Sequence, residues 1–147
     1  MTSSQTAPDT GLSAWTPAQK FAGVFGTVYL IVAIAGFALT GPTGFGEGHD
    51  HTLVIFAVNP LHNYIHLVLA VGWLAAAPRH GTARVANLAI GVVLGLVTVL
   101  GIFGALGMLG MAGMADPDNF LHLATASLAL YFGSLGAMAP DRAESAR

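Results

Sequence analysis

Four apolar stretches, each about as long as a membrane-crossing helix, make up most of this chain. They lie at about residues 18–40, 60–77, 84–109 and 117–139. The hydrocarbon core of a bilayer is about 30 Å thick and requires roughly 20 apolar residues in a helix. Only 8% of the residues are charged and 54% are hydrophobic, which leaves too little polar surface for an ordinary soluble domain. The sequence therefore predicts an all-α polytopic membrane protein with four transmembrane helices within residues 16–139, between a disordered tail at 1–15 and a polar tail at 140–147.

Three of the four stretches begin with a helix-start signal. A residue that commonly caps helices stands directly before a proline at Thr16, Asn59 and Asp116. Such side chains accept a hydrogen bond from the first free backbone N–H groups of a helix. Proline is well tolerated at the first helical position, because its missing N–H has no partner there. We therefore expect these prolines to begin helices and not to kink them.

A five-residue motif occurs twice and indicates an internal duplication. The segment from Asn63 to Leu67 returns 56 residues later as Asn119 to Leu123, each time near the start of an apolar stretch. The pattern predicts two parallel helical-hairpin repeats. In each copy an Asn and a His stand three residues apart, on one side of a helix. Polar side chains inside a bilayer are energetically expensive, so they mark the region in which to look for function.

The basic residues predict the orientation of the helices. They fall at the N-terminus, between the second and third stretches, or at the C-terminus, namely at Lys20, Arg79, Arg84, Arg142 and Arg147. Cytoplasmic loops of membrane proteins carry an excess of such residues. We therefore expect a multi-pass protein of a cytoplasmic membrane with both termini in the cytoplasm, and the two loops without basic residues on the outside.

Several classes of function are disfavoured by what the sequence lacks. The chain has no cysteine and a formal net charge of −2, which removes thiolate chemistry and gives no basis for nucleic-acid binding. It contains no Gly-rich phosphate loop and no nucleophile elbow. These absences favour a non-enzymatic membrane protein, such as an accessory or assembly subunit of a membrane complex.

Histidines near the start of the second and fourth stretches form the candidate site. His62 and His66 are four residues apart, as are Asp118 and His122, so each pair shares one helical face. One interpretation is purely structural, with hydrogen bonds across the helix interface among Asn63, His66, Asn119 and His122. A proton relay or pH sensor based on the same imidazoles is another.

A metal site is the main alternative to the structural interpretation. Three imidazoles and one carboxylate suit Zn²⁺ or Cu²⁺, and the ligands would be His62, His66, His122 and Asp118. A loop that collects the ion would then be formed by Glu47, His49, Asp50 and His51. Haem held by two histidines is a further possibility, supported by their matched depth.

The third stretch is rich in glycine and suits close helix contacts. Gly91 and Gly95 form a GxxxG motif, which allows two helix backbones to approach closely in a membrane. The partner is either another helix of the same chain, a second copy in a homodimer, or another membrane-protein subunit.

The motifs resemble those of a family of small four-helix bacterial membrane proteins that is catalogued as a domain of unknown function. The similarity covers about residues 18–138 and is carried by an HNxxH motif from His62 and a DNxLH motif from Asp118. It implies a location in the bacterial inner membrane and four helices, and it implies no activity. The chain departs from the family pattern at Ala70, at Ala126 and in its His-bearing loop.

Overall fold

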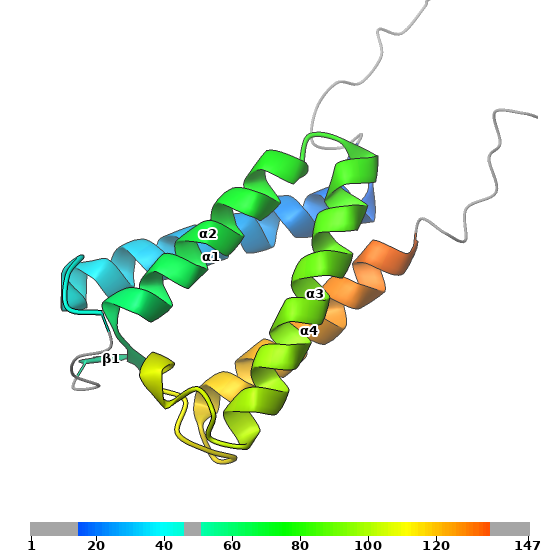
Figure 1. The fold of residues 1–147 in the computed structure, drawn as a ribbon. Coiled ribbons are helices and arrows are strands. Elements are labelled where there is room, and N and C mark those ends of the chain that lie inside the picture. The colour runs from blue at the N-terminus through cyan, green and yellow to red at the C-terminus, as the bar shows by residue number, and fades with distance from the viewer. Residues whose placement is uncertain (1–14, 46–50, 136–147) are drawn as a thin grey trace, which may run out of the picture.

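The computed structural model describes residues 15–45 and 51–135 and is mostly helical. Its four helices are α1 (Pro17–Thr40), α2 (Pro60–Ala76), α3 (His80–Ile102) and α4 (Pro117–Ser134). They form two antiparallel hairpins, because α1 packs along α2 and α3 packs along α4 (Figure 1). A three-residue connection between α2 and α3, residues 77–79, joins the two hairpins.

The three expected helix starts are confirmed. Thr16 caps α1 in a capping box with Gln19, in which each side chain pairs with the backbone of the other. Asn59 caps α2 by accepting a hydrogen bond of 2.9 Å from the backbone N–H of His62. Asp116 caps α4 by accepting from the N–H of Asp118. In all three helices proline occupies the first turn, as the sequence indicates.

The helix surfaces are strongly apolar. Two helices, α1 and α3, are long and apolar enough to cross a membrane. Large apolar side chains are also exposed on each of the four helices, for example Ile31 on α1, Val68 on α2, Leu96 on α3 and Leu123 on α4.

The expected third stretch at 84–109 differs from the observed helix at both ends. Helix α3 begins at His80 and ends at Ile102, and the chain then turns through Gly104 at φ 72°. A short 3₁₀ helix, η2 (Gly107–Leu109), follows, and Gly110 has φ 89°. Glycine loses more backbone entropy in a helix than other residues do, and it adopts positive φ without strain. Gly91 and Gly95 thus lie within α3, whereas Gly104 and Gly110, later in the same glycine-rich stretch, allow the chain to turn after the helix.

The loop before α2 contains a small β-hairpin, which the all-α prediction omits. Strands β1 (His51–Leu53) and β2 (Phe56–Val58) pair in antiparallel register, with Leu53 opposite Phe56. Val54 occupies the turn at φ 63°, an unusual conformation for a β-branched residue. Four-residue apolar runs cannot be assigned to strand or helix from periodicity alone, which explains the omission.

The end of the bundle that carries β1, β2 and η2 is called the loop end here. The loops of the two hairpins contact each other at this end (Figure 1). The Asn59 side-chain N–H donates a hydrogen bond of 2.8 Å to the carbonyl oxygen of Met108, and Gly110 packs against Ala57. These contacts hold the first turns of α2 and α4 close together.

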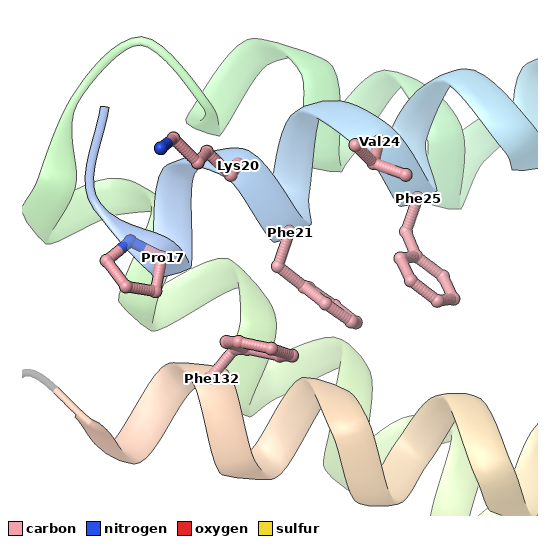
Figure 2. Close-up of a pocket in the computed structure, with 6 residues that line it drawn as sticks. All are labelled: Pro17, Lys20, Phe21, Val24, Phe25 and Phe132. Carbon is pink, nitrogen blue, oxygen red and sulfur yellow. The ribbon is translucent and has the colours of Figure 1, made fainter. Parts of the chain in front are cut away.

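The opposite end, next to the α2–α3 connection, is called the turn end. There the Trp73 indole N–H donates to the Asn87 side-chain oxygen at 3.0 Å, and the Asn87 amide donates to the Ala18 carbonyl at 3.1 Å. Phe21 of α1 stacks on Phe132 of α4 with ring centroids 5.1 Å apart. Figure 2 shows these two rings lining a pocket between the helices. Because the Asn87 side chain of α3 bonds to Trp73 of α2 and to Ala18 of α1, one buried amide joins three helices.

We expect Asn87→Ala to lower the stability of the bundle. The substitution removes two buried hydrogen bonds and leaves the Trp73 indole N–H without a partner, which costs about 1–3 kcal/mol. The thermal denaturation midpoint of the detergent-purified protein measures the effect. Val85→Ala, on the same helix at a side chain that is 67% exposed, is the matched control. Equal midpoints for the two variants would contradict the role given to Asn87.

Candidate metal centre

Three histidines meet in the interior at the loop end of the bundle. His62 and His66 are one turn apart on α2, and His122 lies on α4. All three are buried, and each offers one ring nitrogen to a group in which all the nitrogens lie within 4.8 Å of one another. The ring centroids of His62 and His66 are 4.5 Å apart, and the His122 centroid lies 6.0 and 6.1 Å from them. The structure therefore brings together all three histidines that the sequence nominates.

The ring nitrogens of this cluster lack hydrogen-bond partners. Within the described residues, both nitrogens of His62 and of His66 and the Nδ1 atom of His122 are buried and unpaired. A neutral imidazole has one donor and one acceptor nitrogen, and buried polar atoms in native proteins are nearly always paired. Leaving one such group unpaired costs about 1–3 kcal/mol. The backbone of Ala57 and of Leu109 lies close to the His62 ring, but no hydrogen bond of good geometry forms there. Five buried ring nitrogens without a hydrogen bond in one place make the cluster a candidate ligand site.

The fourth predicted ligand, Asp118, lies one turn before His122 on α4 but outside the group of three. It is buried, and its Oδ2 atom has no hydrogen-bond partner among the described residues. Of the proposed collecting loop, Glu47, His49 and Asp50 lie outside the described residues. His51 begins β1 and is exposed.

Tyr29 of α1 borders the cluster, although the sequence analysis did not select it. Its ring is buried and meets the His66 ring edge-on, with centroids 5.0 Å apart. It also lies edge-on to Trp73, at 5.1 Å. The hydroxyl is buried and forms no hydrogen bond of good geometry among the described residues, although the Thr125 side chain of α4 lies near it. The sequence signal that could have selected it is a single tyrosine in the middle of the otherwise apolar α1 segment.

The two asparagines of the repeated motif bond to groups other than the histidines. The Asn63 amide donates to the Thr40 hydroxyl at 2.9 Å, and the Asn119 amide donates to the Gly113 carbonyl at 2.8 Å. Within the described residues, neither amide pairs with an imidazole. The hydrogen bonds that the structural interpretation expected between Asn and His therefore do not form there, because the Asn63 amide reaches the end of α1 and the Asn119 amide reaches the loop before α4.

Each of these asparagines also packs against a glycine of the neighbouring helix. The Oδ1 atom of Asn63 lies against Gly36 of α1, and that of Asn119 lies against Gly101 of α3. Both oxygens are otherwise unpaired in the described residues, and such close approach suits weak Cα–H···O contacts. A Cβ atom at either glycine would clash with the amide. These contacts set the spacing of the helices beside the histidines.

We expect Gly101→Ala to destabilise the protein, because the added methyl group overlaps the Asn119 amide and a buried Met111 methyl group. Overpacking of this kind typically costs about 1–3 kcal/mol. The thermal midpoint in detergent checks the effect. Gly95→Ala is the control on the same helix, since a Cβ there meets no other atom within 4 Å and alanine is the better helix former. A midpoint for Gly101→Ala at or above that of Gly95→Ala would contradict the expectation.

Comparison with known proteins identifies the family. No curated protein and no solved structure matches this chain significantly. The family described as a domain of unknown function, DUF4383, matches residues 19–135. This range includes all four helices apart from the first two residues of α1. It also contains the three clustered histidines and Tyr29. The similarity to an uncharacterised family that the motifs indicated is thereby confirmed, and the chain belongs to the DUF4383 family.

Proposed function

We propose that this protein is an integral membrane protein that binds one zinc or copper ion through His62, His66 and His122. The observation that carries the proposal is the convergence of three buried imidazoles, of whose six ring nitrogens five are buried without a hydrogen bond in the described residues. A metal ion would satisfy one nitrogen on each ring. The cost of keeping these polar groups inside an apolar bundle would then be offset by coordination.

The ligand chemistry supports zinc or copper. Imidazole nitrogens suit both ions, whereas magnesium and calcium prefer oxygen ligands. In a tetrahedral zinc site, with Zn–N distances of about 2.1 Å, neighbouring nitrogens are roughly 3.4 Å apart. Nitrogens that lie within 4.8 Å of one another reach this spacing by small side-chain rotations. Three convergent rings also favour an ion over haem, which is held by axial ligands on opposite faces of a flat macrocycle.

The structural interpretation, a polar core without a ligand in an accessory subunit, is less well supported. It requires the imidazoles to pair with one another, with the amides or with the backbone. The Asn63 and Asn119 amides have other partners, and five imidazole nitrogens have none in the described residues. Metal binding would pair one nitrogen of each ring, which leaves fewer of them without a partner.

Recurring contacts support an internal duplication with four membrane spans. Gly26 of α1 packs against Leu74 of α2, and Gly91 of α3 packs in the same way against Leu130 of α4. The contacts of Gly36 and Gly101 with the two asparagines recur likewise. Within both sets the glycines are 65 residues apart, and their partners are 56 apart. Together with the exposed apolar side chains on α2 and α4, this repetition favours two similar hairpins that both cross the bilayer.

The proposed location is the bacterial inner membrane, with both termini in the cytoplasm and the loop end outside. The basic residues Arg79 and Arg84 flank the start of α3 at the turn end, and basic residues favour the cytoplasmic side. The histidine cluster then lies in the outer half of the membrane, close to the loop end. A metal ion would reach it from outside the cytoplasm.

We expect the purified protein, loaded with zinc or copper and dialysed, to retain about one ion per chain. His66→Gln and His122→Gln should lose it, because each removes one of three ligands while nearly preserving side-chain volume. Elemental analysis of the detergent-purified variants provides the measurement. His80→Gln, at a histidine of the turn end, should retain the ion. Retention by His122→Gln, or no ion in the unmodified protein, would contradict the proposal.

The topology has its own test, because the chain contains no natural cysteine. We expect a single cysteine at Thr52 of β1 to react with a membrane-impermeant maleimide added to intact spheroplasts. A cysteine at Gly81 should react only after the membrane is opened, since the turn end faces the cytoplasm in the proposed orientation. Both positions are exposed, and a Cβ at Gly81 meets no atom within 4 Å. Labelling of both sites in intact spheroplasts would exclude this topology.

A further inference from the structure

Given the metal site proposed above, on which this inference depends, we propose that its fourth coordination position is left to a small exogenous ligand, a water molecule or a small anion, placed by Tyr29 and Asp118. The protein would then hold the ion with three imidazoles and keep one position exchangeable.

The number of protein ligands is the first argument. Among the described residues, the ligand atoms that lie within 4.8 Å of one another come from three histidines alone. Zn²⁺ is almost always four-coordinate in proteins, and Cu²⁺ usually takes four or more ligands. Structural zinc sites fill all four positions with protein groups, whereas three protein ligands and an open position are typical of sites that bind exchangeable molecules.

Two unpaired polar atoms beside the cluster are the second argument. The Tyr29 hydroxyl and the Asp118 Oδ2 atom are both buried without a hydrogen-bond partner among the described residues. Tyr29 is 5% exposed and Asp118 is 1% exposed. A buried water molecule typically makes about three hydrogen bonds to groups that otherwise have none. A water molecule or small anion near the ion would supply the missing partners.

The positions of Tyr29 and Asp118 allow both side chains to contact one small ligand of the metal ion. The Tyr29 ring meets His66 edge-on at 5.0 Å, and Asp118 lies one helical turn before His122. The side chains of Thr125 and Asp118 on α4 both lie near the Tyr29 hydroxyl. Tyr29 therefore contacts one proposed ligand from α1, and Asp118 shares the helical face of another on α4.

The chemistry of the two groups predicts opposite effects on an anion. A phenol donates a hydrogen bond, whereas an ionised carboxylate only accepts. Tyr29 should therefore stabilise an anion at the open position. In its ionised form, Asp118 should disfavour an anion by like-charge repulsion while accepting a hydrogen bond from water. The buried position limits the ligand to a few atoms.

Cobalt provides a spectroscopic test, because Co²⁺ adopts the same ligands as Zn²⁺ and its visible absorption reports coordination. We expect the full-length protein in detergent to bind one Co²⁺ and its visible bands to shift when azide is added. Tyr29→Phe should bind Co²⁺ equally well but weaken azide binding by about twofold to tenfold, the effect of one lost hydrogen bond. Asp118→Asn should strengthen it. Tyr131→Phe, at an exposed ring on α4, should leave azide binding unchanged.

A second measurement does not depend on the entry of an anion. Electron spin echo spectra of the Cu²⁺-loaded protein in D₂O should show strong deuterium modulation from water at the metal, and Tyr29→Phe should change it. Tyr131→Phe again serves as the control.

The possible failures are distinguishable. If no Co²⁺ or Cu²⁺ binds, the metal site itself is wrong. The open position is excluded if the metal binds but azide does not shift the visible bands of the Co²⁺ protein and D₂O gives no deuterium modulation in the Cu²⁺ protein. If azide acts only on Asp118→Asn, then Asp118 is the fourth ligand. An unchanged azide affinity and an unchanged modulation in Tyr29→Phe would remove Tyr29 from the site.

Discussion

The need to pair every polar group inside an apolar bundle governs this structure. A buried amide or imidazole is out of reach of water, so it must find a partner in the protein or in a ligand. At the turn end, the amide of Asn87 meets this requirement through Trp73 and Ala18. These hydrogen bonds join three helices and use only groups of the protein, so no ligand is needed at that end.

The loop end is built differently. Its two repeated asparagines bond to the end of α1 and to the loop before α4, and they pack against glycines. Five of the six ring nitrogens of the clustered histidines are buried without a hydrogen bond in the described residues. Because one unpaired buried group costs about 1–3 kcal/mol, a cluster of them is unfavourable unless something binds. The two ends of the bundle thus differ: the turn end holds three helices together, and the loop end is the region that we propose binds a ligand.

Much of this arrangement was predictable from local sequence patterns. The capping residues and prolines located the starts of α1, α2 and α4, because capping involves only neighbouring residues. The spacing of His62 and His66 placed both on one helical face for the same reason. The early end of α3 and the β-hairpin were missed. Glycine serves both helix packing and helix ends, and the apolar run from Leu53 to Phe56 has no periodicity that would distinguish strand from helix.

The sequence by itself therefore determined a helical, mostly apolar chain of the DUF4383 family, with polar residues repeated near the starts of α2 and α4. Those properties depend on composition and on contacts between residues a few positions apart. Only the tertiary structure decided that three histidines from two hairpins meet, that Tyr29 of α1 lies beside them, and that the asparagines turn to other partners. These contacts join segments far apart in the chain, and they depend on how closely glycines allow the helices to pack.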